Sequence, residues 1–284
     1  MKYLLYIFLF FLIFACTNKQ SHNKYSEQVI KVMTYNLRND NAYDKENSWQ
    51  YRKAELVDLI EYYHPDFIGI QEALYNQVTY ILNNASNYNY IGTARDDGDK
   101  KGEFSAVYYD SLKFKLIEQK TFWLSESPEV VSVGWDASME RICTYGNFLD
   151  KLTKDTIHIF NTHFDHIGPI ARAKSAELIV SKIDQYDLNN AKIVVMGDLN
   201  SEPQSKPIEI FNSNLKDAQK ISKKKHYGPI GTFNNFDTAL LLEKRIDYVF
   251  TQNLTVKSHR HVDDKRKNNL WVSDHLPVLV EIQK

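Results

Sequence analysis

The chain has 284 residues, of which 43% are hydrophobic and 25% are charged, the balance of an ordinary globular protein. Its formal net charge of −1 supplies no global positive field that would recruit a polyanion. Cys16 lies in an N-terminal segment outside the expected fold, which leaves Cys143 alone and excludes a disulfide framework. No linker rich in Pro, Gly or Ser interrupts the interior, so we expect one domain over residues 29–284.

The N-terminal segment has the composition of a targeting signal. An apolar stretch of 13 residues ends at Ala15, which is short for a membrane-spanning helix but typical of a signal-peptide core. The residues around Ala15 and Cys16 resemble a bacterial lipobox. We therefore expect a signal peptide over 1–15, lipidation of Cys16 and a flexible tether over 16–28. This predicts a membrane-anchored lipoprotein of the cell envelope, facing the periplasm or the exterior, with plain secretion or an uncleaved anchor as alternatives.

Apolar strands and amphipathic helices then alternate along the chain. In the first half we expect strands over 29–37, 66–72, 88–94, 105–109 and 113–123, with helices over 49–63 and 75–83. In the second half we expect paired strands over 141–150 and 156–162, a helix over 171–186, a strand over 192–197, and further segments over 209–212, 246–250, 254–259 and 277–282.

Short polar motifs follow the apolar runs. They are Thr34–Arg38, Gln71-Glu72, Asn161–His163, Gly197–Asn200, Ile246–Tyr248 and Ser273–His275. Together they supply carboxylate and amide oxygens, which suit a hard cation, and two imidazoles. Such a set fits the hydrolysis of a phosphate ester, in which a metal neutralises phosphoryl oxygens while a water is held behind the phosphorus.

The order of these motifs resembles the endonuclease/exonuclease/phosphatase superfamily, whose members include deoxyribonuclease I, exonuclease III and inositol polyphosphate 5-phosphatases. The resemblance runs from about Val29 to Ile282 and is closest to uncharacterised bacterial lipoprotein members. It implies an α/β (α+β) four-layer sandwich, with two packed mixed β-sheets flanked by helices. It does not imply a substrate, because this scaffold carries many functions.

A set of metal and catalytic residues follows from the residue types and from the resemblance. We expect Mg²⁺ or Mn²⁺ to be held at Glu72, with Asn36 and Asp274 nearby. The resemblance assigns Asp198 to the attacking water and pairs Asp247 with His275. It also implies that Asn200 stabilises the transition state, and that Glu103 pairs with His163, which would serve as general acid or phosphate clamp.

Three further residues are candidates for substrate binding. Arg141 could grip phosphate through its planar fork, or form an ordinary ion pair at a strand end. Asp165 and His166 could tune substrate choice, or hold their loop together.

These assignments predict an enzyme that hydrolyses a phosphodiester by in-line attack of water, acting as an exonuclease on nucleic acid or on nucleotides. A phosphatase or a phospholipase C-like enzyme acting on a sugar phosphate or a lipid headgroup is the alternative. A non-catalytic envelope binding protein is the alternative of another class. The expected partners are the phosphate ester and, through the N-terminal lipid, the membrane; we expect a monomer.

Overall fold

The computed structural model describes residues 29–284. The predicted signal peptide, the tether and the lipidation site at Cys16 lie outside the described residues. Within residues 29–284, no helix is long and apolar enough to cross a membrane.

Twelve strands form two mixed sheets of six strands each. The first sheet has the order β11 (Thr255–His261), β12 (Val278–Gln283), β1 (Val29–Asn36), β2 (Phe67–Gln71), β4 (Val107–Asp110) and β3 (Tyr88–Ile91). The second has the order β5 (Phe114–Trp123), β6 (Ile142–Asp150), β7 (Thr156–His163), β8 (Ile193–Asp198), β10 (Asp247–Gln252) and β9 (Lys216–Asp217).

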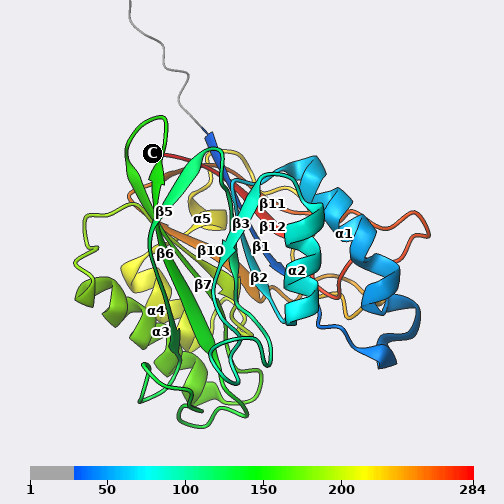
Figure 1. The fold of residues 1–284 in the computed structure, drawn as a ribbon, viewed down its shortest axis with the longest axis horizontal. Helices are drawn as coiled ribbons and strands as arrows, with labels where there is room; N and C mark the ends of the chain where they lie inside the picture. The colour runs from blue at the N-terminus through cyan, green and yellow to red at the C-terminus, as the bar shows by residue number, and fades with distance from the viewer. Residues whose placement is uncertain (1–28) are drawn as a thin grey trace, which may run out of the picture.

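Helices α1 (Trp49–Tyr63) and α2 (Tyr75–Asn84) cover the outer face of the first sheet, and α3 (Pro169–Gln185) and α4 (Lys206–Asn214) cover that of the second. The short η1 (Ala42–Asn47) packs beside α1, and the short α5 (Ala218–Ile221) contacts β10 of one sheet and β11 of the other. Figure 1 shows α1 and α2 on one side of the strands and α3 and α4 on the other. The predicted four-layer sandwich is confirmed.

Three hydrophobic clusters fill the three interfaces between the four layers. One joins α1 and α2 to the first sheet, and includes Leu56 and Ile70. A second lies between the sheets, with Phe67 packed at a ring distance of 5.0 Å from Phe148. The third joins α3 and α4 to the second sheet and includes Phe211. Both faces of each sheet are therefore covered, which explains why β2 and β8 are continuous buried runs rather than alternating ones.

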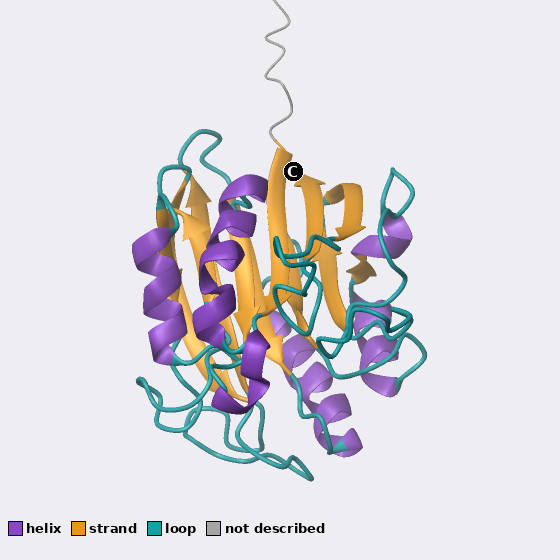
Figure 2. Cartoon of the chain, turned by 90° about the vertical axis from the view of Figure 1, so that its right-hand side faces the viewer, coloured by secondary structure: helices purple, strands orange, loops and turns teal. Residues whose placement is uncertain are grey.

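Each sheet contains one parallel pair of strands joined by a crossover helix. In the first sheet, β1 and β2 run parallel and Asn36 lies opposite Gln71. In the second, β7 and β8 run parallel and His163 lies opposite Asp198. The carboxyl ends of parallel strands are where a sheet of this kind presents functional side chains. Figure 2 shows many of the loops gathered at the end of the molecule opposite the marked C-terminus.

Most strand and helix boundaries agree with the expected ones within three residues, and the differences have local causes. The expected strand over 88–94 ends at Ile91, because Gly92 has a positive φ of 115° and turns the chain. The helix expected from 171 begins at Pro169, which is favoured in the first turn because its missing N–H has no helical partner there. The segment 209–212 lies inside α4.

Candidate active site

A cavity of about 350 Å³ lies where the carboxyl ends of the two parallel strand pairs meet. Its walls come from strand ends of both sheets and from the loops that follow them. The lining residues are Arg38, Asn39, Glu72, Arg95, Glu103, Met139, Arg141, His163, His166, Asp198, Asn200, Phe233, Asn235, Lys244, Ile246, Asp274 and His275. Most of the residues predicted from the motifs are therefore brought together.

Glu72 reaches the cavity because the chain leaves β2 in a strained conformation. Its φ is 63°, a left-handed value that carries a steric cost for a non-glycine residue. Its carboxylate accepts hydrogen bonds from Asn36 Nδ2 at 3.0 Å and from the Asn39 backbone N–H at 3.3 Å. This strain aims the carboxylate at the cavity instead of at the core.

Asn36 is fully buried beneath the cavity and joins the two sheets. Besides Glu72, its Nδ2 donates to Asp198 Oδ2 at 2.9 Å, while its Oδ1 accepts from the Arg38 backbone N–H at 3.0 Å. The side chain is therefore already engaged at both ends. In this arrangement Asn36 holds the metal-binding and water-binding carboxylates at a set separation, and its Oδ1 keeps a second lone pair for the predicted metal.

Asp198, Asp247 and His275 form a buried array. His275 Nδ1 lies 2.9 Å from Asp247 Oδ2, and its Nε2 lies 3.7 Å from Asp198 Oδ2. Burial alone would lower the pKa of His275, but the Asp247 and Asp198 carboxylates outweigh it and raise that pKa to about 10. His275 is therefore a cation at neutral pH, and the predicted Asp247–His275 pair is present as a direct hydrogen bond.

The Asp198 carboxylate has the electrostatic character of a general base. Burial raises the pKa of Asp198 to about 7, with the Asp247 charge adding to the effect and His275 opposing it. A base whose pKa lies near the working pH combines a useful deprotonated population with a useful proton affinity. Asp198 also lines the cavity, which places it against any bound substrate.

His163 is a neutral hydrogen-bond donor to the cavity. Burial, followed by the charges of Arg141 and Arg95, holds the pKa of His163 well below its usual range. The Asn200 amide donates to Phe164 O at 3.0 Å and lies 3.1 Å from His163 Nε2, which makes that nitrogen the acceptor. The proton of His163 therefore sits on Nδ1, which has no hydrogen-bond partner.

This geometry bears on two of the predicted roles. Asn200 lines the cavity, and its amide group contacts His163 Nε2 and Phe164 O, so it also orients the His163 ring. The predicted Glu103–His163 pair is separated by 3.9 Å, beyond a hydrogen bond, because Glu103 forms a 2.6 Å ion pair with Arg95. His163 is better suited as a phosphate clamp than as a general acid.

Three carboxylates face the same part of the cavity. Burial raises the pKa of Asp274 to about 6, with Glu72 adding to the effect and His275 opposing it. Burial and then the Glu72 charge also raise the pKa of Glu103. Their mutual repulsion is the feature that a divalent cation would relieve, and Glu72 and Asp274 offer the oxygen ligands that hard cations prefer. The Arg38 guanidinium lies about 4.0 Å from the Glu72 carboxylate and about 4.0 Å from the Asp274 carboxylate.

The three candidates for substrate binding fall into different places. Arg141 lines the cavity, with Nη2 3.0 Å from His166 Nδ1 and a buried Nη1 that has no partner. Asp165 does not line the cavity: its carboxylate accepts from Ser138 and from the backbone N–H groups of Ile167 and Gly168. Arg141 also forms the ion pair that was its alternative, with Nε 3.4 Å from Asp165 Oδ2. Asp165 thus supports its loop, which was the alternative for that residue, while Arg141 and His166 both line the cavity.

Several cavity residues were not predicted from the sequence. Arg38 is the last residue of the first motif, and it is the one of these residues whose place in the cavity the sequence indicated. Arg95 comes from a loop that contains no motif, Lys244 lies two residues before the Ile246–Tyr248 motif, and Phe233 packs its ring 5.1 Å from His275. With Arg141, three of these residues give the cavity four permanent cationic groups beside its carboxylates.

A comparison with known protein families identifies the family of this chain. The profile of the Endonuclease/Exonuclease/phosphatase family matches residues 33–275. The chain belongs to this family. An endonuclease/exonuclease/phosphatase from Bacteroides vulgatus is 35% identical, with a TM-score of 0.86 over 90% of this chain and 99% of that one. A mannosyl-6-phosphatase from Bacteroides thetaiotaomicron is also 35% identical, with a TM-score of 0.85 over 90% of this chain and 100% of that one.

More distant relatives carry other activities. The probable RNA exonuclease NGL3 of Saccharomyces cerevisiae is 24% identical over 63% of this chain, which matches only 39% of that protein. Members of the family are phosphoesterases and generally depend on a divalent metal. The protein is accordingly a phosphoesterase of this family, and its cavity holds carboxylates and imidazoles of the kind that bind such a metal.

Proposed function

We propose that the protein is a Mg²⁺- or Mn²⁺-dependent phosphatase that hydrolyses the phosphate monoester of a sugar. The observation that carries this proposal is the small cavity of about 350 Å³, in which four cationic side chains surround a carboxylate cluster. The similarity to a mannosyl-6-phosphatase at 35% identity over 90% of this chain supports it. This is the alternative to the exonuclease activity that we expected from the sequence.

The charge of the substrate distinguishes the two activities. A phosphate monoester carries close to two negative charges at neutral pH, whereas each linkage of a nucleic acid carries one. Arg95, Arg141 and Lys244 line the cavity in addition to the carboxylates that suit a metal. The buried Arg141 Nη1, which lacks a partner, offers a donor for a phosphoryl oxygen. A volume near the lower end of the range for ligand pockets suits one sugar phosphate better than a polynucleotide.

The reaction begins with a water held against the Asp198 carboxylate. With its pKa raised to about 7, Asp198 orients this water and accepts its proton as the oxygen attacks phosphorus. The bond from phosphorus to the sugar oxygen breaks in the same step, and that oxygen leaves as a hydroxyl by taking a proton from solvent. Asn36 keeps Asp198 Oδ2 in place through the 2.9 Å hydrogen bond. The water is therefore positioned by a residue that is itself anchored across both sheets.

The negative charge that develops on the phosphoryl group meets donors from several sides. His275, held as a cation by Asp247, lies beside Asp198, and His163 presents its free Nδ1–H. Arg141 adds a donor that is already desolvated. Glu72 and Asp274 would hold the metal, which supplies charge neutralisation to the phosphate when it is bound.

A substrate panel tests this proposal. The purified protein is assayed with mannose 6-phosphate, p-nitrophenyl phosphate, bis-p-nitrophenyl phosphate and short RNA, with Mg²⁺, with Mn²⁺ and after EDTA. We expect rapid hydrolysis of the sugar monoester, loss of activity in EDTA, and recovery on adding metal. Faster turnover of RNA or of the diester than of both monoesters would overturn the phosphatase assignment.

An exonuclease remains the second candidate, because the yeast RNA exonuclease shares sequence with 63% of this chain. Its signature in the same panel is release of nucleotides from short RNA with inert monoesters. Inactivity on every substrate, despite bound metal, would instead favour the non-catalytic binding protein.

We also propose that the protein acts as a monomer tethered to the cell envelope by a lipid on Cys16. Processing that is sensitive to globomycin, and incorporation of labelled palmitate that is lost in Cys16→Ser, would support this location. A full-length, unprocessed product in the soluble fraction would contradict it. Gel filtration of the solubilised protein tests the oligomeric state.

A further inference from the structure

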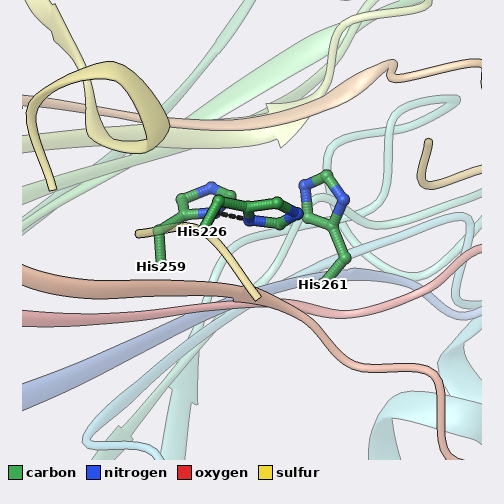
Figure 3. A group of neighbouring side chains, drawn as sticks. All are labelled: His226, His259 and His261. Carbon is green, nitrogen blue, oxygen red and sulfur yellow. Dashed lines mark hydrogen bonds between the residues drawn. The ribbon is translucent and has the colours of Figure 1, made fainter. Parts of the chain in front are cut away.

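A cluster of three histidines lies apart from the cavity, at the edge of the first sheet. His259 and His261 are two residues apart on β11 and therefore point to the same face. A bulge between Val256 and Ser258 shifts the alternation of the strand so that both rings face inward. His226 comes from the loop that follows α5, and Figure 3 shows its ring between the other two.

The loop that carries His226 is bound along the edge of β11. The backbone N–H of Tyr227 donates to His259 O at 3.2 Å, and that of His261 donates to Tyr227 O at 3.1 Å. Gly228 has a φ of 109°, and a Cβ there would lie 2.2 Å from His261 O, so only glycine permits this approach. The turn brings the Pro229 carbonyl directly against the histidine rings.

The hydrogen bonds determine which ring nitrogens are free. Pro229 O accepts from His226 Nε2 at 3.0 Å and from His261 Nδ1 at 2.8 Å. With its proton on Nε2, His226 uses Nδ1 to accept from His259 Nδ1 at 2.9 Å. The lone pairs of His259 and His261 therefore reside on Nε2, and both of these buried nitrogens have no partner.

Two buried acceptors without partners are costly, and they indicate a missing ligand. One ring nitrogen of each histidine lies within 4.8 Å of those of the other two. With one proton and one free lone pair each, the His259 and His261 rings are in the neutral form that binds a metal.

We propose that His226, His259 and His261 bind a transition-metal ion, Zn²⁺ being the best match to three neutral imidazoles. Zn²⁺–N distances of about 2.0–2.1 Å place tetrahedral ligands about 3.4 Å apart, so the three rings, whose nearest nitrogens now lie within 4.8 Å of one another, must turn and draw together when the metal binds. The partly exposed His226 moves most and exchanges its hydrogen bond with His259 for the metal. The Pro229 carbonyl orients the His261 ring, as carbonyl partners commonly do at metal sites.

The site would hold the loop that leads to the active site. Beyond Pro229 the chain reaches Thr232, whose carbonyl accepts from the Leu276 backbone N–H at 2.7 Å. Phe233 then pairs with His275 as an isolated bridge and lines the cavity. A metal at the three histidines would therefore stabilise this segment. The proposal concerns nitrogen ligands on a different edge and is independent of the proposed phosphatase activity.

The test must separate this site from the metal of the cavity. Zn²⁺ binding is measured by calorimetry, and its stoichiometry by elemental analysis after dialysis, on a Glu72→Gln protein in which the cavity lacks its main carboxylate ligand. We expect one tightly bound Zn²⁺ with a Kd of about 1 μM or below. We also expect Tm to rise by about 5 °C when Zn²⁺ is in 100-fold excess over Kd. Co²⁺ in place of Zn²⁺ should give the visible absorption of a tetrahedral nitrogen-rich site.

Adding His226→Gln should abolish the tight site and the rise in Tm, because glutamine can still donate to Pro229 O but supplies no imidazole. His64→Asn is the matched control: it removes a partly exposed histidine at a left-handed helix end, where asparagine is tolerated. It should leave Zn²⁺ binding unchanged. Equal Zn²⁺ binding with and without His226, or no tight Zn²⁺ in the Glu72→Gln protein, would overturn the proposal.

Discussion

Asn36, at the end of β1 in one sheet, donates a 2.9 Å hydrogen bond to Asp198, at the end of β8 in the other. The same amide nitrogen donates to Glu72 at 3.0 Å. A single neutral side chain therefore sets the distance between the carboxylate that suits the metal and the carboxylate that suits the water. In a reaction that depends on in-line geometry, this distance controls the rate.

The first prediction follows from this link. Asn36→Ala leaves two buried carboxylates without their shared donor, so we expect kcat to fall about 100-fold, the usual cost of a misplacement near 1 Å. The free energy of unfolding should fall by about 1–3 kcal/mol, because buried acceptors are left unsatisfied. Steady-state kinetics and urea unfolding measure the two effects.

Asn161→Ala is the control for this experiment. Asn161 also bridges the sheets, accepting from Gln71 at 2.7 Å and donating to two backbone carbonyls, but it does not line the cavity. It should lose stability to a similar degree with a smaller loss of kcat in the folded protein. Equal losses of kcat in both variants would show that Asn36 acts only through stability.

The second prediction concerns the charge on His275. Asp247→Asn removes the main source of its raised pKa, so the pKa of His275 should fall from about 10 towards neutrality. We expect kcat to fall by about 10- to 100-fold, as for other orienting partners of catalytic imidazoles. NMR titration of the His275 ring and kinetics at several pH values check both expectations.

Asp150→Asn provides the comparison, because Asp150 is a buried carboxylate at the far end of β6, bound to Lys284. It should retain kcat and leave the His275 titration unchanged. An unchanged His275 pKa in Asp247→Asn would mean that Asp198 alone holds the imidazolium.

The strand-end residues of the site could be predicted because the sequence marks where each strand stops. Glu72 and Asp198 each follow a short apolar run, and in a parallel pair such ends meet at one edge. The helix Trp49–Tyr63 was predicted with its observed bounds, since the residue before Pro65 is disfavoured in a helix.

The rest of the site depends on loops whose course the sequence does not specify. Arg95 and Lys244 reach the cavity only through the path of the loops that carry them. The role of Asp165 could not be decided for a related reason. A carboxylate that accepts hydrogen bonds from backbone N–H groups and a carboxylate that binds substrate are both simply an Asp in the sequence. His226 lies 33 positions from His259 in the sequence, and the two rings meet only because the loop that carries His226 runs along the edge of β11.

The third prediction tests the close packing of the parallel strands beneath the site. Gly197 has a φ of 151°, and a Cβ there would lie 2.0 Å from the backbone oxygen of Thr162 on β7. Because backbone cannot move aside as a flexible side chain can, we expect Gly197→Ala to reduce the free energy of unfolding by about 3 kcal/mol or more. It should also displace Asp198 and lower kcat.

Gly98→Ala separates the clash from the conformational strain. Gly98 has a φ of 74°, but the nearest atom to its added Cβ is on the flexible Trp123 side chain at 3.2 Å. We expect a loss of about 1 kcal/mol from the left-handed backbone alone. Similar losses of stability in the two variants, measured by urea unfolding, would argue against a backbone clash at Gly197.

The fourth prediction is a pH dependence of folding stability that arises from His158, on β7 away from the cavity. Its Nδ1 lies 3.0 Å from the Tyr145 hydroxyl, and burial lowers its pKa below the usual value of 6.5. The folded state therefore binds the His158 proton less readily than the unfolded state does. The stability is fully present above pH 6.5 and is lost as the pH falls towards the folded pKa, by at most about 1.4 kcal/mol per pH unit.

His158→Gln keeps a hydrogen-bonding partner for Tyr145 but cannot titrate, so its unfolding free energy should fall less than that of the wild type between pH 7 and pH 5. Parallel curves for wild type and His158→Gln in urea unfolding would show that His158 titrates alike in the folded and unfolded states.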